Sequence, residues 1–229
     1  ETLDEDCDRG TRIEIHLRKE DERFADPGTV KSAIQRYSNF VGFPIHVDNE
    51  LVNQTTALWR EPPHQVKDEQ YNEFYKLVSH DFQDPKLRLH FSADAPVQFS
   101  ALLFIPESSP EVMGFGQGEV NLQLYVKRVL IDSENKDLLP KHLRFVRGVV
   151  ESEDLPLNIS RETLQENSQL KSIRKLLTRR LLKMFLDLAK EDADQYRSLW
   201  QTYGKMLKES YTDHDQRELF PEMLRFNSL

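Results

Sequence analysis

The sequence has one cysteine, only eight glycines among 229 residues, and no long apolar run. Cys7 lies in an acidic stretch, so no internal disulfide can form and no neighbouring base is available to activate the thiol. No apolar run approaches the roughly 20 residues that span a bilayer, and the N-terminus is acidic where a secretory signal is basic and then apolar. We therefore expect a soluble globular protein of the cytosol or another reducing compartment, with no membrane contact.

The sequence also lacks a net positive charge and metal-ligand patterns. The formal net charge is −8, which argues against a general nucleic-acid binder, because such proteins usually carry a net basic surface. The seven histidines have no His-x-x-x-His or Cys-x-x-Cys companion, so the sequence does not support a metal site. The chain starts without methionine in a charged tail, and we expect it to be part of a longer protein.

The first fifty residues predict a short strand, helix and strand. Thr11–Leu17 alternates apolar and charged residues, which is typical of a half-buried strand. Asp26 followed by Pro27 indicates the start of a helix, and residues 44–47 indicate a second strand. Residues 48–56 are interpreted as a polar connector.

The next hundred residues predict a sheet with helices. Pro62 and Pro63 indicate a turn, and a helix capped by Asp68 is expected to carry an apolar face through Phe82. The segment 97–105 is apolar on both faces, which is typical of a central strand. The other predicted elements are strands at 87–91, 120–126 and 128–131 and a short helix at 138–145.

From Asn167 onward the apolar spacing is helical, and it predicts two long helices. Together with the preceding strands, this pattern predicts an α/β fold with a helical extension. Six cations on the first helix form either a solvated face, which we favour, or a surface for an acidic partner. They are Lys171, Arg174, Lys175, Arg179, Arg180 and Lys183.

The glycine-rich run 114–118 is interpreted as a hairpin loop. It precedes a predicted strand, whereas a phosphate-binding loop follows a strand and opens a helix. No nucleotide-binding loop and no metal-binding carboxylate pair is visible, so a self-contained phosphotransferase is disfavoured.

Arg161 is the most unusual residue of the chain. It follows Ser160, a candidate helix N-cap, although the positive end of a helix normally attracts acids. Gln165 lies four residues further on, so in a helix the guanidinium and the amide share one face and could bind one anion. The alternative is a solvated surface arginine.

Trp59 has two open interpretations. It precedes the proline turn, where an exposed tryptophan would be a candidate for contact with another protein. A buried anchor for the turn is the alternative.

The run 148–165 closely resembles the catalytic-loop signature of the heat-shock protein ninety chaperones of the HtpG type. The resemblance extends over essentially the whole chain. Other matching runs are 37–40, 57–59, 73–76, 102–106, 124–129, 143–147 and 224–226.

The resemblance implies a domain organisation. Residues 1–50 would be the tail of an N-terminal ATP-binding domain with a short linker, and 51–190 a three-layer α/β/α middle domain with a mixed sheet. Residues 191–229 would be a helical connector. The nucleotide pocket would lie upstream, so the chain alone is expected not to hydrolyse ATP.

The resemblance also implies roles and partners. Arg161 would reach the γ-phosphate of ATP bound with Mg²⁺, Gln165 would assist it, and Trp59 would contact client proteins or another domain. The expected partners are the protein's own N-terminal ATPase domain, unfolded clients, and a second copy through a C-terminal domain beyond Leu229. The expected compartment is the bacterial-type cytoplasm, with the mitochondrial matrix as an alternative. A non-catalytic interaction module in which Arg161 is structural remains the competing function.

Overall fold

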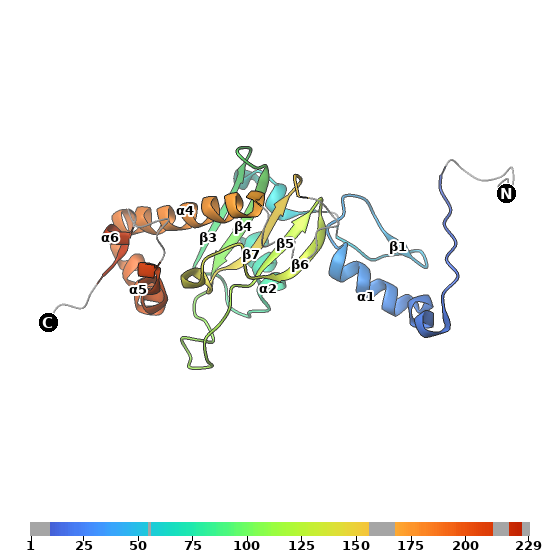
Figure 1. Ribbon diagram of the computed structural model, residues 1–229, viewed down its shortest axis with the longest axis horizontal. Coiled ribbons are helices and arrows are strands. Elements are labelled where there is room, and N and C mark those ends of the chain that lie inside the picture. The colour runs from blue at the N-terminus through green and yellow to red at the C-terminus, as the bar shows by residue number, and fades with distance from the viewer. Residues whose placement is uncertain (1–9, 55, 156–167, 213–219, 226–229) are drawn as a thin grey trace.

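The computed structural model describes residues 10–54, 56–155, 168–212 and 220–225 (Figure 1). A five-stranded mixed sheet forms its centre, with helices on both faces. No helix of the described part is both long and apolar enough to cross a membrane.

The N-terminal segment differs from the predicted strand, helix and strand. The strand prediction for Thr11–Leu17 is wrong: these residues are irregular, and Ile13 and Ile15 are 79% and 73% exposed. The alternating pattern requires a neighbouring strand, and none pairs with it among the described residues. The 3₁₀ helix η1 (Lys19–Ala25) follows instead.

The helix predicted at Pro27 is confirmed as α1 (Pro27–Tyr37). The Asp26 carboxylate accepts a hydrogen bond from the Thr29 amide at 2.7 Å, as an N-cap residue does. The strand predicted at 44–47 is confirmed in part as β1 (His46–Val47). It forms a two-stranded hairpin with β2 (Glu50–Leu51), which lies in the predicted connector.

The sheet contains β3 (Leu87–Ala93), β4 (Phe99–Ile105), β5 (Leu122–Val126), β6 (Val129–Asn135) and β7 (Arg147–Ser152). Their order is β3-β4-β7-β5-β6; only the β5–β7 pair is parallel. The sequence analysis missed β7, the middle strand, and β4 lies next to it. The hairpin prediction for residues 114–118 is wrong, because β7 separates the two strands that this loop joins.

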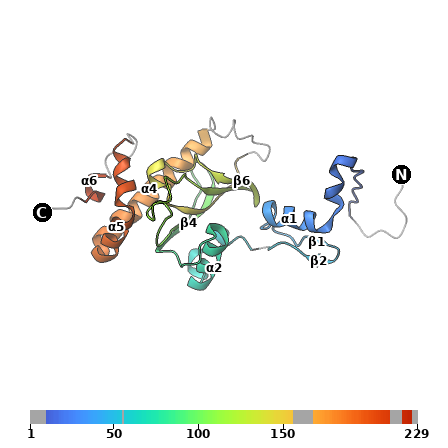
Figure 2. The ribbon, with the colours of Figure 1, turned by 90° about the horizontal axis from the view of Figure 1, so that it is seen from below.

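One face of the sheet is covered by the turn η2 (Leu58–Arg60) and the helix α2 (Asp68–Ser79), with η3 (Pro63–Gln65) between them (Figure 2). Lys67, rather than Asp68, occupies the N-cap position of α2. Phe82 lies beyond the helix end and is 94% exposed, so its predicted place on the apolar face is wrong. His80 ends α2 in the left-handed conformation and turns the chain before Phe82.

The opposite face is covered by α4 (Ser168–Glu191) and α5 (Ala193–Lys208), as the helical spacing predicts. Tyr203 of α5 stacks on Phe145 with ring centroids 4.1 Å apart, so α5 shares the core of the sheet. The six cations of α4 are all exposed, as on a solvated face. The short elements are η4 (Lys141–Leu143), where a helix over 138–145 was predicted, η5 (Glu209–Thr212) and α6 (Phe220–Met223). The domain boundaries at residues 50 and 190 stay predictions.

A buried arginine joins the loop after β4 to the end of α5. The Arg144 side chain is 1% exposed and donates to the Glu111 carboxylate at 2.7 and 2.8 Å and to that of Glu209 at 2.6 and 2.8 Å. These bonds hold the pKa of both carboxyl groups below the ordinary 4.5. Such a network stabilises a fold only while each buried polar group keeps its hydrogen-bond partner.

This network predicts a loss of stability in acid. Because the folded-state pKa values are lowered, the stabilisation is complete above pH 4.5 and is lost as the pH falls through the folded-state values. Glu111→Gln should cost about 2 kcal/mol at neutral pH and flatten the decline of the thermal midpoint as the pH falls below about 4.5. The control is Glu119→Gln, which removes an exposed pair with Lys136 and should change little. An equal effect of both variants would contradict the assignment.

Candidate functional site

Arg161 and Gln165, the two residues that the sequence nominates for catalysis, lie outside the described residues. The structure describes both ends of the segment that carries them. The chain is described through Leu155, three residues beyond β7, and again from Ser168, where α4 begins. The candidate site is therefore built from these two ends and from the contacts that hold them in place.

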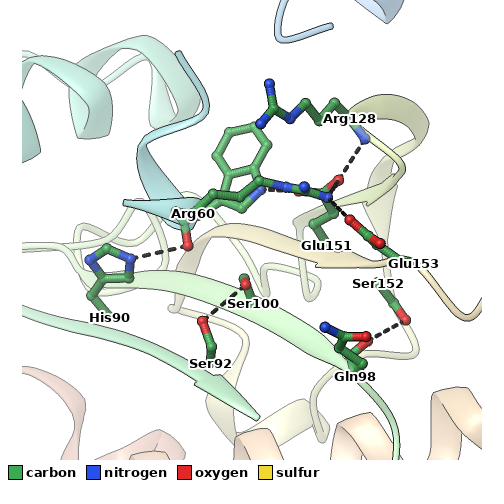
Figure 3. Close-up of polar contacts among 10 residues, drawn as sticks. Arg60, His90, Ser92, Gln98, Ser100, Arg128, Glu151, Ser152 and Glu153 are labelled. Atoms are coloured by element: carbon green, nitrogen blue, oxygen red, sulfur yellow. Dashed lines mark hydrogen bonds and ion pairs between the residues drawn. The ribbon is translucent and has the colours of Figure 1, made fainter. Parts of the chain in front are cut away.

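Glu151, near the end of β7, is the centre of a buried polar network (Figure 3). Its side chain is 1% exposed. Oε2 accepts hydrogen bonds from Trp59 Nε1 at 2.5 Å and from Arg60 Nε at 2.6 Å. Oε1 accepts from Arg60 Nη2 at 2.7 Å and from the backbone amide of Arg128 at 2.6 Å. One carboxylate thus joins β7 to the η2 turn and to the turn between β5 and β6.

Arg60 supplies the counter-charge of this buried carboxylate. Its guanidinium binds Glu151 through two parallel N–H groups, and Nη2 also donates to Glu153 at 2.6 Å. The hydrogen bond to Glu151 is the main reason that the pKa of Arg60 is raised. A bidentate pair of this kind fixes orientation as well as distance. An open cleft of about 200 Å³ lies beside it, lined also by Gln98 and Ser100.

Three further contacts fix the chain at the end of β7 and just beyond it. Ser152 Oγ donates to the Gln98 carbonyl at 2.8 Å, and the Gln98 amide donates to the Asp154 carboxylate at 2.8 Å. The Leu155 side chain is 1% exposed and joins the core. On the far side, Leu170 in the first turn of α4 is 2% exposed. Both ends of the segment that carries Arg161 therefore start from packed positions.

Trp59 is fully buried, so the structure shows the buried-anchor alternative and not the exposed one. Its ring lies 4.9 Å from Phe40 and 5.0 Å from Tyr125, and its carbonyl oxygen lies 3.1 Å from His90 Nε2. A direct contact between Trp59 and a client would require this packing to open. Its predicted role in client or interdomain contact is otherwise untested.

Arg60 and Glu151 were missed by the sequence analysis, although one signal was present. Glu151 directly follows Val149 and Val150 in a short apolar run, where a charged residue needs a buried partner. That partner is about ninety residues away in sequence, and only the fold brings it near. No group of three or more His, Cys, Asp or Glu side chains in the described ranges is placed to hold a metal ion.

A second candidate surface lies where α2 ends, opposite the loop after β4. It is an open cleft of about 530 Å³. Three strongly exposed apolar side chains line it: Phe82 (94%), Phe115 (80%) and Met113 (63%). Exposed apolar side chains gathered around one cleft commonly mark sites that bind other proteins.

The fold and the site define an α/β module whose middle strand leads directly into a segment with an unusual arginine. The family model described as Hsp90 protein matches residues 46–229. The chain is 48% identical to chaperone protein HtpG of Nitratidesulfovibrio vulgaris over 96% of its length and 34% of the relative's. It is 47% identical to chaperone protein HtpG of Oleidesulfovibrio alaskensis over 96% of its length and 35% of the relative's.

This chain belongs to the Hsp90 family, in its HtpG-type branch. It spans about a third of the length of the curated relatives that it matches. The resemblance recognised in the sequence is thereby confirmed, as is the mixed α/β fold.

Proposed function

We propose that this chain is the middle segment of an ATP-dependent chaperone and that it supplies Arg161 to the γ-phosphate of ATP bound by a preceding domain. The observation that carries the proposal is the fixed start of the arginine segment, where Glu151, Ser152, Asp154 and Leu155 are all held by packing or hydrogen bonds. A catalytic group must be held close to its productive geometry, and a fixed base restricts where the segment can reach.

The proposed chemistry needs a cation more than a base. As the terminal phosphoryl group leaves, negative charge develops on its oxygens, and a guanidinium can neutralise it through two parallel N–H donors. Mg²⁺ bound with the nucleotide would share this neutralisation. Gln165 is proposed to bind the same phosphate or to orient Arg161. The test is ATP turnover by the full-length protein with Arg161 replaced by alanine, at unchanged nucleotide affinity.

Several features of the whole protein follow only as proposals. The N-terminal ATPase domain is the first partner, and the chain alone is expected to be inactive. Dimerisation through a C-terminal domain and a bacterial cytoplasmic location fit the relatives named chaperone protein HtpG. These bacterial relatives give no support to the mitochondrial alternative.

A client-binding surface is the second part of the proposal, and the apolar cleft supports it. Phe82, Met113 and Phe115 expose apolar surface around one opening, where an unfolded segment could bury its own apolar side chains. This surface would also serve the competing function, a non-catalytic scaffold. The turnover of the Arg161 variant separates the two functions.

The cleft yields a binding prediction. Replacing Met113 and Phe115 together by serine should weaken binding of a permanently unfolded, apolar test protein about tenfold or more, because each side chain loses about 1.5–3 kcal/mol of possible burial. Binding can be measured by fluorescence anisotropy of the labelled client. The matched control is Leu51→Ser, since Leu51 is 55% exposed in the β1–β2 hairpin and lines no part of this cleft. Unchanged affinity in the double variant would remove the cleft from the proposal.

A further inference from the structure

Glu151 gathers contacts from parts of the chain that are distant in sequence. Four donors converge on its two oxygens, from the η2 turn and from the β5–β6 turn. A carboxylate that is 1% exposed is costly to bury, and the cost is offset only if its partners stay in place. The groups around Glu151 are therefore mutually dependent.

The N-terminal segment rests on the same groups. The Phe40 ring packs edge-on against Trp59 at 4.9 Å, and it lies 5.9 Å from Tyr125. Gly42 lies so close to Arg128 that a Cβ atom there would be 2.5 Å from Nη1. Trp59, which supports Phe40, is thus one of the three residues that donate to Glu151, together with Arg60 and the amide of Arg128.

We propose that Glu151 is a positioning residue that couples Phe40 of the N-terminal segment to the end of β7. The coupling runs through Phe40, Trp59 and Glu151. A displacement of the N-terminal segment changes the support of the Trp59 ring, and the indole is bonded directly to the carboxylate near the end of β7. This inference rests on the proposed function, because its consequence is read in ATP turnover.

Charge is the property of Glu151 that matters. Glu151→Gln keeps the shape but replaces one acceptor oxygen by an amide that faces N–H donors, and it leaves Arg60 without its buried counter-ion. The expected result in the full-length protein is a fall of about tenfold in ATP turnover at saturating nucleotide, with unchanged nucleotide affinity, because a displacement near 1 Å can cost that much or more. Glu153→Gln is the matched control. It removes the half-exposed partner of the same arginine and should leave turnover within about twofold.

A spectroscopic signal tests the network itself. In the 229-residue chain, Trp200→Phe leaves Trp59 as the only tryptophan, and its indole donates to Glu151. Its emission should shift with Glu151→Gln and stay unchanged with Glu153→Gln. A shift of equal size in both variants would show general loosening and would overturn the proposal.

Combination with the Arg161 variant separates positioning from mere structural support. If Glu151 acts through the segment that carries Arg161, then Glu151→Gln should cause no further loss of turnover in the Arg161→Ala protein. A further tenfold loss in that background would overturn the proposal. Undiminished turnover of Arg161→Ala alone would instead refute the proposed function. A full effect of Arg161→Ala with none from Glu151→Gln would refute only the inference.

Phe40→Leu provides a second variant that leaves the buried carboxylate intact. It removes the ring that packs edge-on against Trp59 at 4.9 Å. A fall of about threefold or more in turnover, with unchanged nucleotide affinity, is expected from the coupling. Parental turnover in this variant would overturn the proposal.

Discussion

Replacing Gly148 by alanine is expected to destabilise the chain by about 4 kcal/mol or more, because β7 has no room for a side chain at this position. Gly148 has φ +136°, a conformation that residues with a Cβ rarely adopt. The new Cβ would lie 2.2 Å from the Leu102 carbonyl oxygen and 2.9 Å from the Cα of Leu103. Both obstacles belong to the backbone of β4, which cannot rotate away.

The middle position of β7 makes this strain difficult to relieve. Strand β4 pairs with it on one side and β5 on the other, so a shift of β7 breaks hydrogen bonds on both edges. Urea unfolding followed by circular dichroism measures the effect. Gly118→Ala is the control, since the nearest atom to its Cβ would be 3.8 Å away and its backbone is not in the left-handed region. A loss below about 1 kcal/mol for Gly148→Ala would contradict this account.

Local patterns predicted the helices well because a helix is a local structure. Leu170, Ile173 and Leu177 recur at helical spacing and form one apolar face of α4. This face packs against the sheet. The N-cap at Asp26 was equally predictable, since the cap bond closes within three residues.

The sheet was harder to predict because its pairing is not local. Thr11–Leu17 has a strand pattern without a strand partner in the described chain, whereas β7 has partners on both sides and no alternating pattern. Because both faces of β7 are covered, Val149 and Val150 are both buried, and period-two reasoning finds nothing there.

The candidate site shows the same division between local and distant information. Arg161 and Gln165 were nominated by a helix-start anomaly and by a family resemblance, and both signals lie within a short run of sequence. The support from Trp59 and Arg60 to Glu151 joins residues about ninety positions apart, so no sequence window contains it. The burial of Trp59 likewise depends on Phe40 and Tyr125, from two other segments.

Replacing Arg161 by alanine in the full-length protein is expected to lower ATP turnover about a hundredfold or more and to leave nucleotide affinity unchanged. The cation is proposed to act on charge that develops during phosphoryl transfer, so its loss should lower the turnover number rather than binding. Arg161→Lys keeps the charge but loses the two parallel donors, so it should recover only part of the rate. Arg174→Ala is the matched control, because it removes an exposed cation from the adjoining helix α4.

The most direct test of the account is steady-state ATP turnover of the full-length protein and its Arg161→Ala variant, with nucleotide affinity measured by calorimetry on the same samples. The account predicts turnover lowered about a hundredfold or more at equal affinity, with Arg174→Ala at the parental rate. Parental turnover in the Arg161→Ala variant would contradict it and would leave this segment a scaffold with a client-binding surface.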